Sequence, residues 1–257
     1  MIPAMHRFFI PPEWIQGRTV TLDGAIVHQI RHVLRLRPGD HILVLDNSGW
    51  EWEVELTEVS KNRVKGRTQG KSLVRGESRT KITLYQGVLK GNRFEFALQK
   101  GTEIGVVEFV PVVSSRCVIA NVDAVEKKLP RWRRIVLEAA EQARRGRLPV
   151  IRPAMLFAAA CERARLSGGL SILPWEEAEA SLKLLLRGGD REAEAASRPF
   201  SINLFIGPEG GFSADEVNLA QRYGIHPVTL GPRILRAETA GLVAAAAILY
   251  ELGDLER

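Results

Sequence analysis

The chain has 257 residues, of which 26% are charged, and its formal net charge is +6 at neutral pH. This length is enough for one large domain or for two smaller domains with hydrophobic cores of their own. The excess of positive charge is small, which argues against a disordered basic tail, and it favours a polyanionic partner such as RNA.

No apolar run approaches the roughly 20 residues that a membrane-spanning helix needs. The longest run, at residues 241–250, is rich in alanine and too short. The first residues lack the charged and apolar regions of a signal peptide. Cys117 and Cys161 are isolated in the sequence, which excludes a disulfide framework and a CxxC zinc knuckle. We therefore expect a soluble, cytoplasmic protein with no membrane partner.

The first 70 or so residues predict mainly β-structure. Strands are expected at residues 41–46, 50–59 and 63–68, with a hairpin turn at 47–49, and only residues 25–36 have a helical pattern. Within 50–59, apolar residues alternate with glutamates, which is typical of a half-buried strand. Short antiparallel strands with a single helix indicate a small barrel.

From residue 80 onwards, strands alternate with helices. Such alternation implies a parallel sheet with helices on both faces, and these sheets bind ligands beyond the carboxyl ends of their strands. The polar residues 70–79 form the expected linker, and the polar insert at 188–199 is expected to be a surface loop. The expected strands are residues 82–89, 107–113, 170–174, 202–206 and 227–230, and the expected helices are residues 93–103, 129–145, 155–166, 178–186, 214–223 and 238–252.

A glycine-rich turn is the most informative segment of the chain. The strand at 202–206 ends in Gly-Pro-Glu-Gly-Gly at 207–211, and Ser213 with Glu216 forms a capping box that begins a helix. This arrangement leaves backbone N–H groups free to bind a ligand, whereas the alternative is a tight turn that needs glycine only for its geometry. A second glycine corner follows at 230–239, and two such corners favour a shared ligand crevice.

The residues of the glycine turn limit what it can bind. The chain lacks both the G-x-G-x-x-G fingerprint of dinucleotide sites and the GK[ST] of a P-loop. Glu209 lies within the turn without a neighbouring lysine, which argues against a triphosphate. An acidic residue among free N–H groups better suits a ligand with ribose hydroxyls or a positive centre. S-adenosylmethionine has both, although the chemistry alone does not single it out.

Together the two corners closely resemble the C-terminal motifs of a known family. The first reads Gly-Pro-Glu-Gly-Gly-Phe-Ser from residue 207, and the second reads Leu-Gly at 230–231 and Ile-Leu-Arg-Ala-Glu-Thr-Ala at 234–240. These sequences are similar to those of the ribosomal small-subunit RNA uridine-N3 methyltransferases, the RsmE family of the SPOUT superfamily. Small departures at Gly101, Cys117 and Ala143 affect no proposed role. Weaker similarities along the rest of the chain are Arg7-Phe8-Phe9, His28, 33–35, 39–40, 99–105, 115–116, 138–142, Arg145 and Pro149.

The resemblance implies an α/β protein with two domains. Residues 1–72 would form a PUA-like RNA-binding β-barrel. Residues 77–257 would form a SPOUT methyltransferase domain, with a parallel sheet flanked by helices and a C-terminal trefoil knot. The resemblance also implies a homodimer. The segment 241–249, which is apolar on nearly all faces, agrees with a helix covered by a partner and also with an ordinary core helix.

The resemblance further implies an activity, a cofactor and a substrate. The cofactor is S-adenosylmethionine, and the reaction is methylation of N3 of a specific uridine in 16S ribosomal RNA, free or within the small ribosomal subunit. Three corners of the chain would hold the cofactor. The residues expected in them are Leu173, Pro174, Ile206, Gly207, Pro208, Glu209, Gly210, Leu230, Gly231, Ile234, Leu235 and Arg236.

Two of these residues are also candidates for catalysis. Uracil N3 lies on the pairing edge of the base and carries a proton, so the base must leave its stack and lose that proton. We assign Glu209 as the acid or base and Arg236 as the cation that stabilises charge on the flanking carbonyls. Two alternatives remain open: Glu209 as a ribose ligand or an acceptor for amides of the turn, and Arg236 as a salt-bridge partner of Glu209 or Glu238.

The expected RNA contacts are basic residues. Two of them lie four positions apart and share a face of the expected helix at 25–36. His28 and His32 have the spacing of two metal ligands, but the glutamate of H-E-x-x-H is missing and arginines surround them, so we expect no metal. The expected contacts are Arg7, His28, Arg31, Arg35 and Arg116.

Three other functions are weighed against this one. A SPOUT methyltransferase acting on a ribose 2′-hydroxyl or on a transfer RNA base is the nearest, and the combination of both motifs argues against it. A non-catalytic RNA-binding or ribosome-assembly protein would not need intact glycine corners. A nucleotide-dependent enzyme of ordinary doubly wound type is disfavoured by the missing fingerprints.

Overall fold

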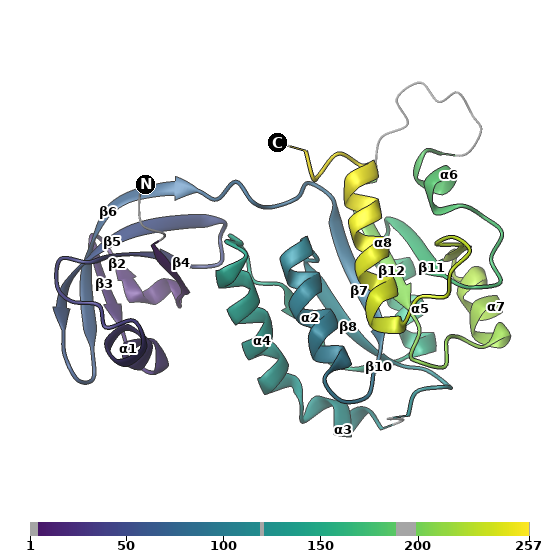
Figure 1. The fold of residues 1–257 in the computed structure, drawn as a ribbon, viewed down its shortest axis with the longest axis horizontal. Helices are drawn as coiled ribbons and strands as arrows, with labels where there is room; N and C mark the ends of the chain where they lie inside the picture. The colour runs from purple at the N-terminus through teal and green to yellow at the C-terminus, as the bar shows by residue number, and fades with distance from the viewer. Residues whose placement is uncertain (1–4, 119–120, 189–198, 257) are drawn as a thin grey trace. The chain divides into compact units, whose positions relative to one another are not determined.

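The computed structural model describes residues 5–118, 121–188 and 199–256 (Figure 1). The chain divides into two compact units. The N-terminal unit consists of Met1–Glu77 and Ala140–Leu148, and the C-terminal unit of Ser78–Ala139 and Pro149–Arg257. The segment Ala140–Leu148 thus groups with the N-terminal unit, although the sequence analysis assigned it to the C-terminal domain. The expected domain boundaries themselves stay predictions.

The N-terminal unit contains a sheet of six strands, counted over its described residues, in the order β1-β4-β5-β6-β3-β2. β1 runs parallel to β4, and the other neighbouring pairs are antiparallel. The sequence analysis missed β1, β2 and β3, because strands of two to four residues have little periodicity of their own. The elements are β1 (His6–Phe9), η1 (Pro12–Trp14), β2 (Ile15–Gln16), β3 (Thr19–Leu22), α1 (Ala25–His28), η2 (Gln29–Val33), β4 (His41–Leu45), β5 (Trp50–Val59) and β6 (Val64–Leu73).

The helix expected at residues 25–36 is only partly an α-helix. α1 ends at His28, and the chain continues as one turn of π-helix, η2. Val27 and Ile30 from this segment are buried in the core of the sheet. Arg35 then adopts a left-handed φ of 57°, which ends the helical run. β6 also extends to Leu73, so the linker begins later than the sequence indicated.

A buried ion pair holds the segment Ala140–Leu148 in the N-terminal unit. Arg145 donates from Nε and Nη2 to the two carboxylate oxygens of Glu77, over 2.9 and 2.8 Å, and the Arg145 side chain is only 4% exposed. The N–H groups of Gly146 and Arg147 donate to the same carboxylate. Burial alone raises the pKa of Glu77, but Arg145 and the two N–H groups outweigh burial, and the pKa is lowered.

The C-terminal unit contains a parallel sheet in the order β10-β8-β7-β12-β11-β13, with β9 also paired to β8. Every neighbouring pair in it is parallel, as the sequence predicted. Its strands are β7 (Lys81–Gly87), β8 (Glu108–Val113), β9 (Val150–Ile151), β10 (Met155–Leu156), β11 (Leu170–Pro174), β12 (Ser201–Ile206) and β13 (His226–Val228). Its helices are α2 (Arg93–Ile104), α3 (Val122–Glu126), α4 (Leu129–Gln142, whose last residues belong to the N-terminal unit), α5 (Phe157–Ser167), α6 (Leu182–Leu186), α7 (Ala214–Arg222) and α8 (Ala237–Glu251).

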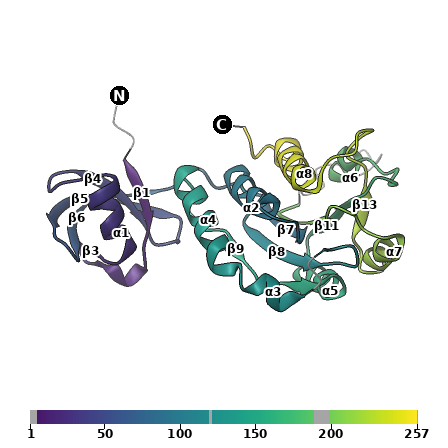
Figure 2. The ribbon, with the colours of Figure 1, turned by 60° about the horizontal axis from the view of Figure 1, so that its bottom comes forward.

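Helices cover both faces of this parallel sheet (Figures 1 and 2). One hydrophobic core lies under α2, α4 and α8, and the other lies under α5 and α7. Leu84 and Tyr85 are neighbours on β7 and point into different cores, because successive side chains of a strand face opposite sides. The α/β fold class is therefore confirmed, whereas the trefoil knot stays a prediction.

Two expected helices begin later than the sequence indicated. Met155 and Leu156 form the short strand β10, so α5 begins at Phe157. The helix expected at 178–186 is limited to α6, because Ala180 and Ser181 pair with Thr229 instead. The loop expected at 188–199 lies almost entirely outside the described residues. None of the helices in the described ranges has the length and apolar character needed to cross a membrane.

We predict that the Glu77→Gln variant is less stable than the wild type at pH 7 by about 3 kcal/mol, because the substitution removes the carboxylate charge that faces the buried Arg145 guanidinium. The lowered pKa of Glu77 fixes the sign of the pH dependence. Its stabilising contribution is present above the pKa of the unfolded chain and is lost as the pH falls through the folded-state value. In urea unfolding followed from pH 7 to pH 3, the difference between the two proteins should stay constant down to the usual pKa of 4.5 and shrink below it.

The matched control is Glu58→Gln, which removes the exposed ion pair between Glu58 and Lys65 in the same unit. Exposed pairs contribute little, so its free energy of unfolding should stay close to that of the wild type. Equal effects of both substitutions would contradict a special role for the buried pair.

Candidate cofactor site

The first glycine corner joins the end of β12 to α7. Gly211 has a φ of 66°, and its N–H donates to Pro208 O over 2.9 Å, which closes the turn. The capping box predicted at the start of α7 is present: Glu216 N–H donates to Ser213 Oγ, and Ser213 N–H donates to the Glu216 carboxylate. The corner is therefore a defined turn that leads directly into a capped helix.

The loop after β8 forms hydrogen bonds to this corner on one side. Ser115 N–H donates to Glu216 Oε1 over 2.7 Å. Arg116 donates from Nη1 to Gly210 O over 2.9 Å. Arg116, expected to contact RNA, thus has a partner within the protein at the glycine corner.

The end of β7 packs closely against the corner on the other side. A Cβ atom on Gly87 would lie 2.5 Å from Pro208 N and 2.7 Å from Gly207 C, closer than real Cβ atoms approach backbone. Gln86 lies beside them, and its side-chain amide donates to Gly207 O over 3.5 Å. β7 and the corner can therefore meet only because position 87 has no side chain.

The second glycine corner follows β13, next to the end of β11. Pro174 and Val228 are register partners, and Trp175 N–H donates to Val228 O over 3.0 Å. Gly231 has a φ of 105°, and its N–H donates to Thr229 Oγ1 over 3.1 Å. Because β12, β11 and β13 are neighbours in the sheet, the structure brings all three expected corners together.

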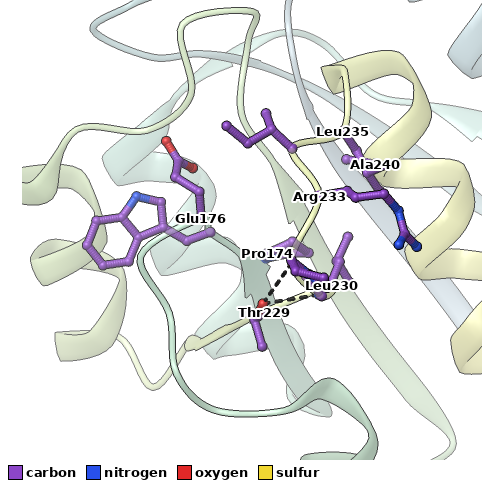
Figure 3. A pocket seen from close by; sticks show the side chains of 11 residues that line it. Pro174, Glu176, Thr229, Leu230, Arg233, Leu235 and Ala240 are labelled. Carbon is purple, nitrogen blue, oxygen red and sulfur yellow. Dashed lines mark hydrogen bonds between the residues drawn. The ribbon is translucent and has the colours of Figure 1, made fainter.

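Two adjoining cavities lie between these corners. One, of about 440 Å³, is lined by Pro174, Leu230 and Leu235 among others, which Figure 3 shows around it. The other, of about 540 Å³, lies against the glycine corner. All the residues expected to bind the cofactor line one or both cavities except Leu173, which is fully buried in the core under α5 and α7. Both volumes are in the usual range for small-molecule sites.

Several residues of the cavities were missed by the sequence analysis. Trp175 and Glu176 follow the Pro174 corner directly, and their position after a strand end was the signal available. Arg93 has no such signal, because it comes from the start of α2, more than one hundred residues earlier in the chain than Glu209.

The carboxylate of Glu209 is held by two donors. Its Oε1 accepts from Lys90 N–H over 2.9 Å and from Arg93 Nη1 over 3.2 Å. Arg93 Nε also lies 3.9 Å from the Glu238 carboxylate. Burial raises the pKa of Glu209, but the Lys90 N–H and the Arg93 charge outweigh burial and lower the pKa below its usual value. A carboxylate with a lowered pKa is a weak base, so this environment favours the acceptor role of Glu209.

Arg236 does not have the environment expected of a salt-bridge partner of Glu209 or Glu238. Glu209 and Glu238 pair with Arg93, and Arg236 forms no salt bridge within the described part of the chain. It is exposed at the N-cap of α8, and it lines the cavity at the glycine corner. Its charge is therefore available to a ligand in that cavity.

The residues expected to bind RNA do not share one environment. Arg7 pairs with Glu51 over 2.6 Å, and its side chain is 9% exposed, so it is held inside the N-terminal unit. His28 and Arg31 line a small cavity on the surface of that unit, and Arg35 is exposed. In the described residues, no three or more His, Cys, Asp or Glu side chains form a cluster suited to holding a metal ion.

Comparison with known proteins identifies the family. An RNA methyltransferase domain model matches residues 76–249, and an RNA methyltransferase PUA domain model matches residues 22–69. Ribosomal RNA small subunit methyltransferase E of Bacillus subtilis strain 168 is 33% identical over 96% of this chain and 97% of its own length. The chain belongs to the ribosomal RNA small subunit methyltransferase E family. The resemblance carried by the glycine corners is thereby confirmed.

Other family members agree with this assignment. The relative from Synechocystis sp. PCC 6803 is 35% identical over 95% of this chain and 77% of its own length. The crystal structure of the Neisseria gonorrhoeae member, bound to S-adenosyl methionine, superposes with a TM-score of 0.83. It is 33% identical and covers 96% of this chain and 97% of its own. The similarity therefore extends over both units of the family fold.

We predict that Gly87→Ala lowers the free energy of unfolding by about 2 kcal/mol, because the added Cβ forces Pro208 and the backbone of β7 apart. Thermal or urea unfolding measures the change. Gly70→Ala is the matched control, since its Cβ would meet nothing within 4 Å. An unchanged stability of Gly87→Ala would show that the corner can move away without cost.

Proposed function

We propose that this protein transfers the methyl group of S-adenosylmethionine to N3 of a specific uridine in the 16S ribosomal RNA of the small ribosomal subunit. The observation that carries the proposal is the crevice formed by three chain corners at the carboxyl ends of neighbouring parallel strands, in a member of this family. A relative with the same fold carries S-adenosyl methionine in its crystal structure, which supports the choice of cofactor.

The residues around the crevice suit this cofactor. Backbone groups at Gly207 and Gly231 offer hydrogen bonds to adenine and ribose, and Leu230 and Leu235 supply apolar surface for the ring. Glu176 places a carboxylate beside the cavity, which favours a ligand with a positive centre. When bound, S-adenosylmethionine supplies an electrophilic methyl group on a sulfonium ion.

The protein's part in the reaction is to position the uracil nitrogen and to stabilise the charge that appears when N3 loses its proton to solvent. Arg236 is the cation we assign to that charge, because it lines the cavity and has no salt bridge among the described residues. Glu209 holds the glycine corner through Lys90 N–H and Arg93, and its lowered pKa makes it a poor base. Positioning alone contributes much of the barrier reduction in such displacements.

We further propose that the protein is a homodimer. Gly241, Ala244, Ala245, Ile248 and Leu249 bury one side of α8, but Val243 and Tyr250 stay exposed on its other side. An exposed apolar stripe on a helix favours a covering partner, and a second copy offers the same stripe. Light scattering of the purified protein tests this, and a monomer mass would contradict it.

We also propose that the protein works in the cytoplasm, because its proposed RNA substrate is found there, and cell fractionation tests this.

The experiment that tests the function is mass spectrometry of nucleosides from small-subunit ribosomal RNA after incubation with the protein and S-adenosylmethionine. The RNA or subunits should come from cells that lack the gene. We expect 3-methyluridine to appear. A different methylated nucleoside would indicate another position, and no methylation despite cofactor binding would indicate an RNA-binding role.

We predict that Arg236→Ala lowers kcat about 100-fold, because the charge on the uracil carbonyls loses its stabilising cation. Affinity for S-adenosylhomocysteine, measured by calorimetry, should change little. Arg222→Ala, which removes an exposed arginine from the last turn of α7, is the matched control and should retain wild-type turnover. Loss of cofactor affinity without a separate loss of turnover would remove Arg236 from catalysis.

We predict that Glu209→Gln keeps turnover of the same order as the wild type. The amide oxygen still accepts from Lys90 N–H, whereas a base would be abolished by the substitution. Single-turnover methylation rates at saturating cofactor measure the difference. A loss as large as that of Arg236→Ala would restore Glu209 as the catalytic base.

A further inference from the structure

We propose that the cavity between the first turn of α2 and the first turn of α8 binds the pyrimidine base that receives the methyl group. This inference rests on the proposed function and names the place of its substrate. The cavity has a volume of about 650 Å³ and lies entirely within the C-terminal unit. Its lining includes Lys90, Asn92, Arg93, Phe96 and Thr239.

The cavity lies next to the cofactor crevice and shares two lining residues with it. Arg93 and Glu238 line both this cavity and the one at the glycine corner. The Arg93 guanidinium stands at the boundary, held by the Glu209 carboxylate at 3.2 Å and near the Glu238 carboxylate at 3.9 Å. A base at the mouth of the cavity would therefore contact Arg93 while its N3 edge faces the cofactor crevice, which Arg236 also lines.

The polar groups of the cavity match the edge of uracil. That edge presents two carbonyl oxygens, one on each side of N3, and both accept hydrogen bonds. The cavity offers donors to them: the Lys90 ammonium, the Arg93 guanidinium and the Asn92 amide. Cytosine carries an amino group in place of one carbonyl, so it would leave a donor unpaired, and such mismatches are strongly discriminated against.

The same groups suit the charge that forms when N3 loses its proton. The negative charge then spreads onto both carbonyl oxygens, near Lys90 and Arg93 in this cavity and near Arg236 in the adjoining crevice. Asn92 is the N-cap residue of α2, but its side chain makes no capping hydrogen bond, so the amide is free to meet the base. The N-terminus of α2 also carries a partial positive charge that favours a nearby anion.

Phe96 gives the cavity a surface on which a base can stack. The residue is 45% exposed, although it belongs to a helix whose neighbouring residues Phe94, Ala97 and Leu98 are buried. Aromatic side chains stack on nucleobases that have left their helix. The competing explanation is that a second copy of the chain covers Phe96, and the experiment below separates the two.

The first test compares Phe96→Ala and Asn92→Ala with the wild type in steady-state methylation of ribosomal RNA. Each variant should lower kcat/KM for RNA about tenfold. Calorimetric affinity for S-adenosylhomocysteine and the mass by light scattering should stay unchanged. Gln99→Ala, on an exposed site of the same helix, is the matched control and should behave as the wild type.

Three results would overturn the proposal. They are an unchanged kcat/KM for RNA in both variants, a loss of affinity for S-adenosylhomocysteine as large as the loss of kcat/KM, or a change of oligomeric state in Phe96→Ala. The last result would assign Phe96 to an interface between copies. Failure of the proposed function looks different, since the wild-type protein itself would then methylate no uridine.

A second test does not depend on methylation. Short RNAs carrying 4-thiouridine are irradiated with the wild-type protein in the presence of S-adenosylhomocysteine, and crosslinked peptides are identified by mass spectrometry. We expect crosslinks to the peptide that contains Asn92 and Phe96. These crosslinks should persist when the nucleotides that flank the 4-thiouridine are replaced by cytidine. Crosslinks confined to other peptides would overturn the assignment even if the enzyme is active.

Discussion

The site depends on the close approach of β7 to the glycine corner. Backbone meets backbone where Gly87 faces Gly207 and Pro208, at distances that leave no room for a Cβ atom. On the other side, Glu216 and Arg116 join the corner to the loop after β8. The corner is therefore fixed from two neighbouring strands, and this fixes the position of its backbone. A preorganised corner of this kind avoids the cost of ordering a loop each time a ligand binds.

One arginine, Arg93, pairs with both carboxylates beside this corner. Glu209 and Glu238 come from different corners of the crevice, and both approach Arg93. Without Arg93 the two carboxylates would lack a shared cationic partner. The sequence analysis named Arg236 as the other arginine that could pair with them. Because Arg93 takes this role, Arg236 keeps its charge for a ligand. A structural ion pair thus determines which arginine is available for chemistry.

The sequence predicts those parts of the fold and site that have local signals. The capping box of Ser213 and Glu216, the β-rich and α/β halves, and the two glycine corners all follow from residues close together in the chain. Other features arise from contacts over long sequence distances. The strand pairing of Ser181 with Thr229 replaced part of an expected helix, and Arg93 reached the corner from the start of α2. Leu173 was expected at the cofactor from the family resemblance, and alternation along β11 turns its side chain into the core.

The position of α8 shows why its sequence alone was ambiguous. The helix is apolar on nearly every face, which is compatible with full burial in one chain or with burial shared between two. In the C-terminal unit it packs on the sheet through Ala244, Ala245 and Ile248, while Val243 and Tyr250 remain exposed. Its first turn also borders the cofactor crevice and the cavity beside Phe96. A second copy that covered the exposed stripe of α8 would therefore lie next to both cavities, and dimerisation would add a wall to the site where the base is proposed to bind.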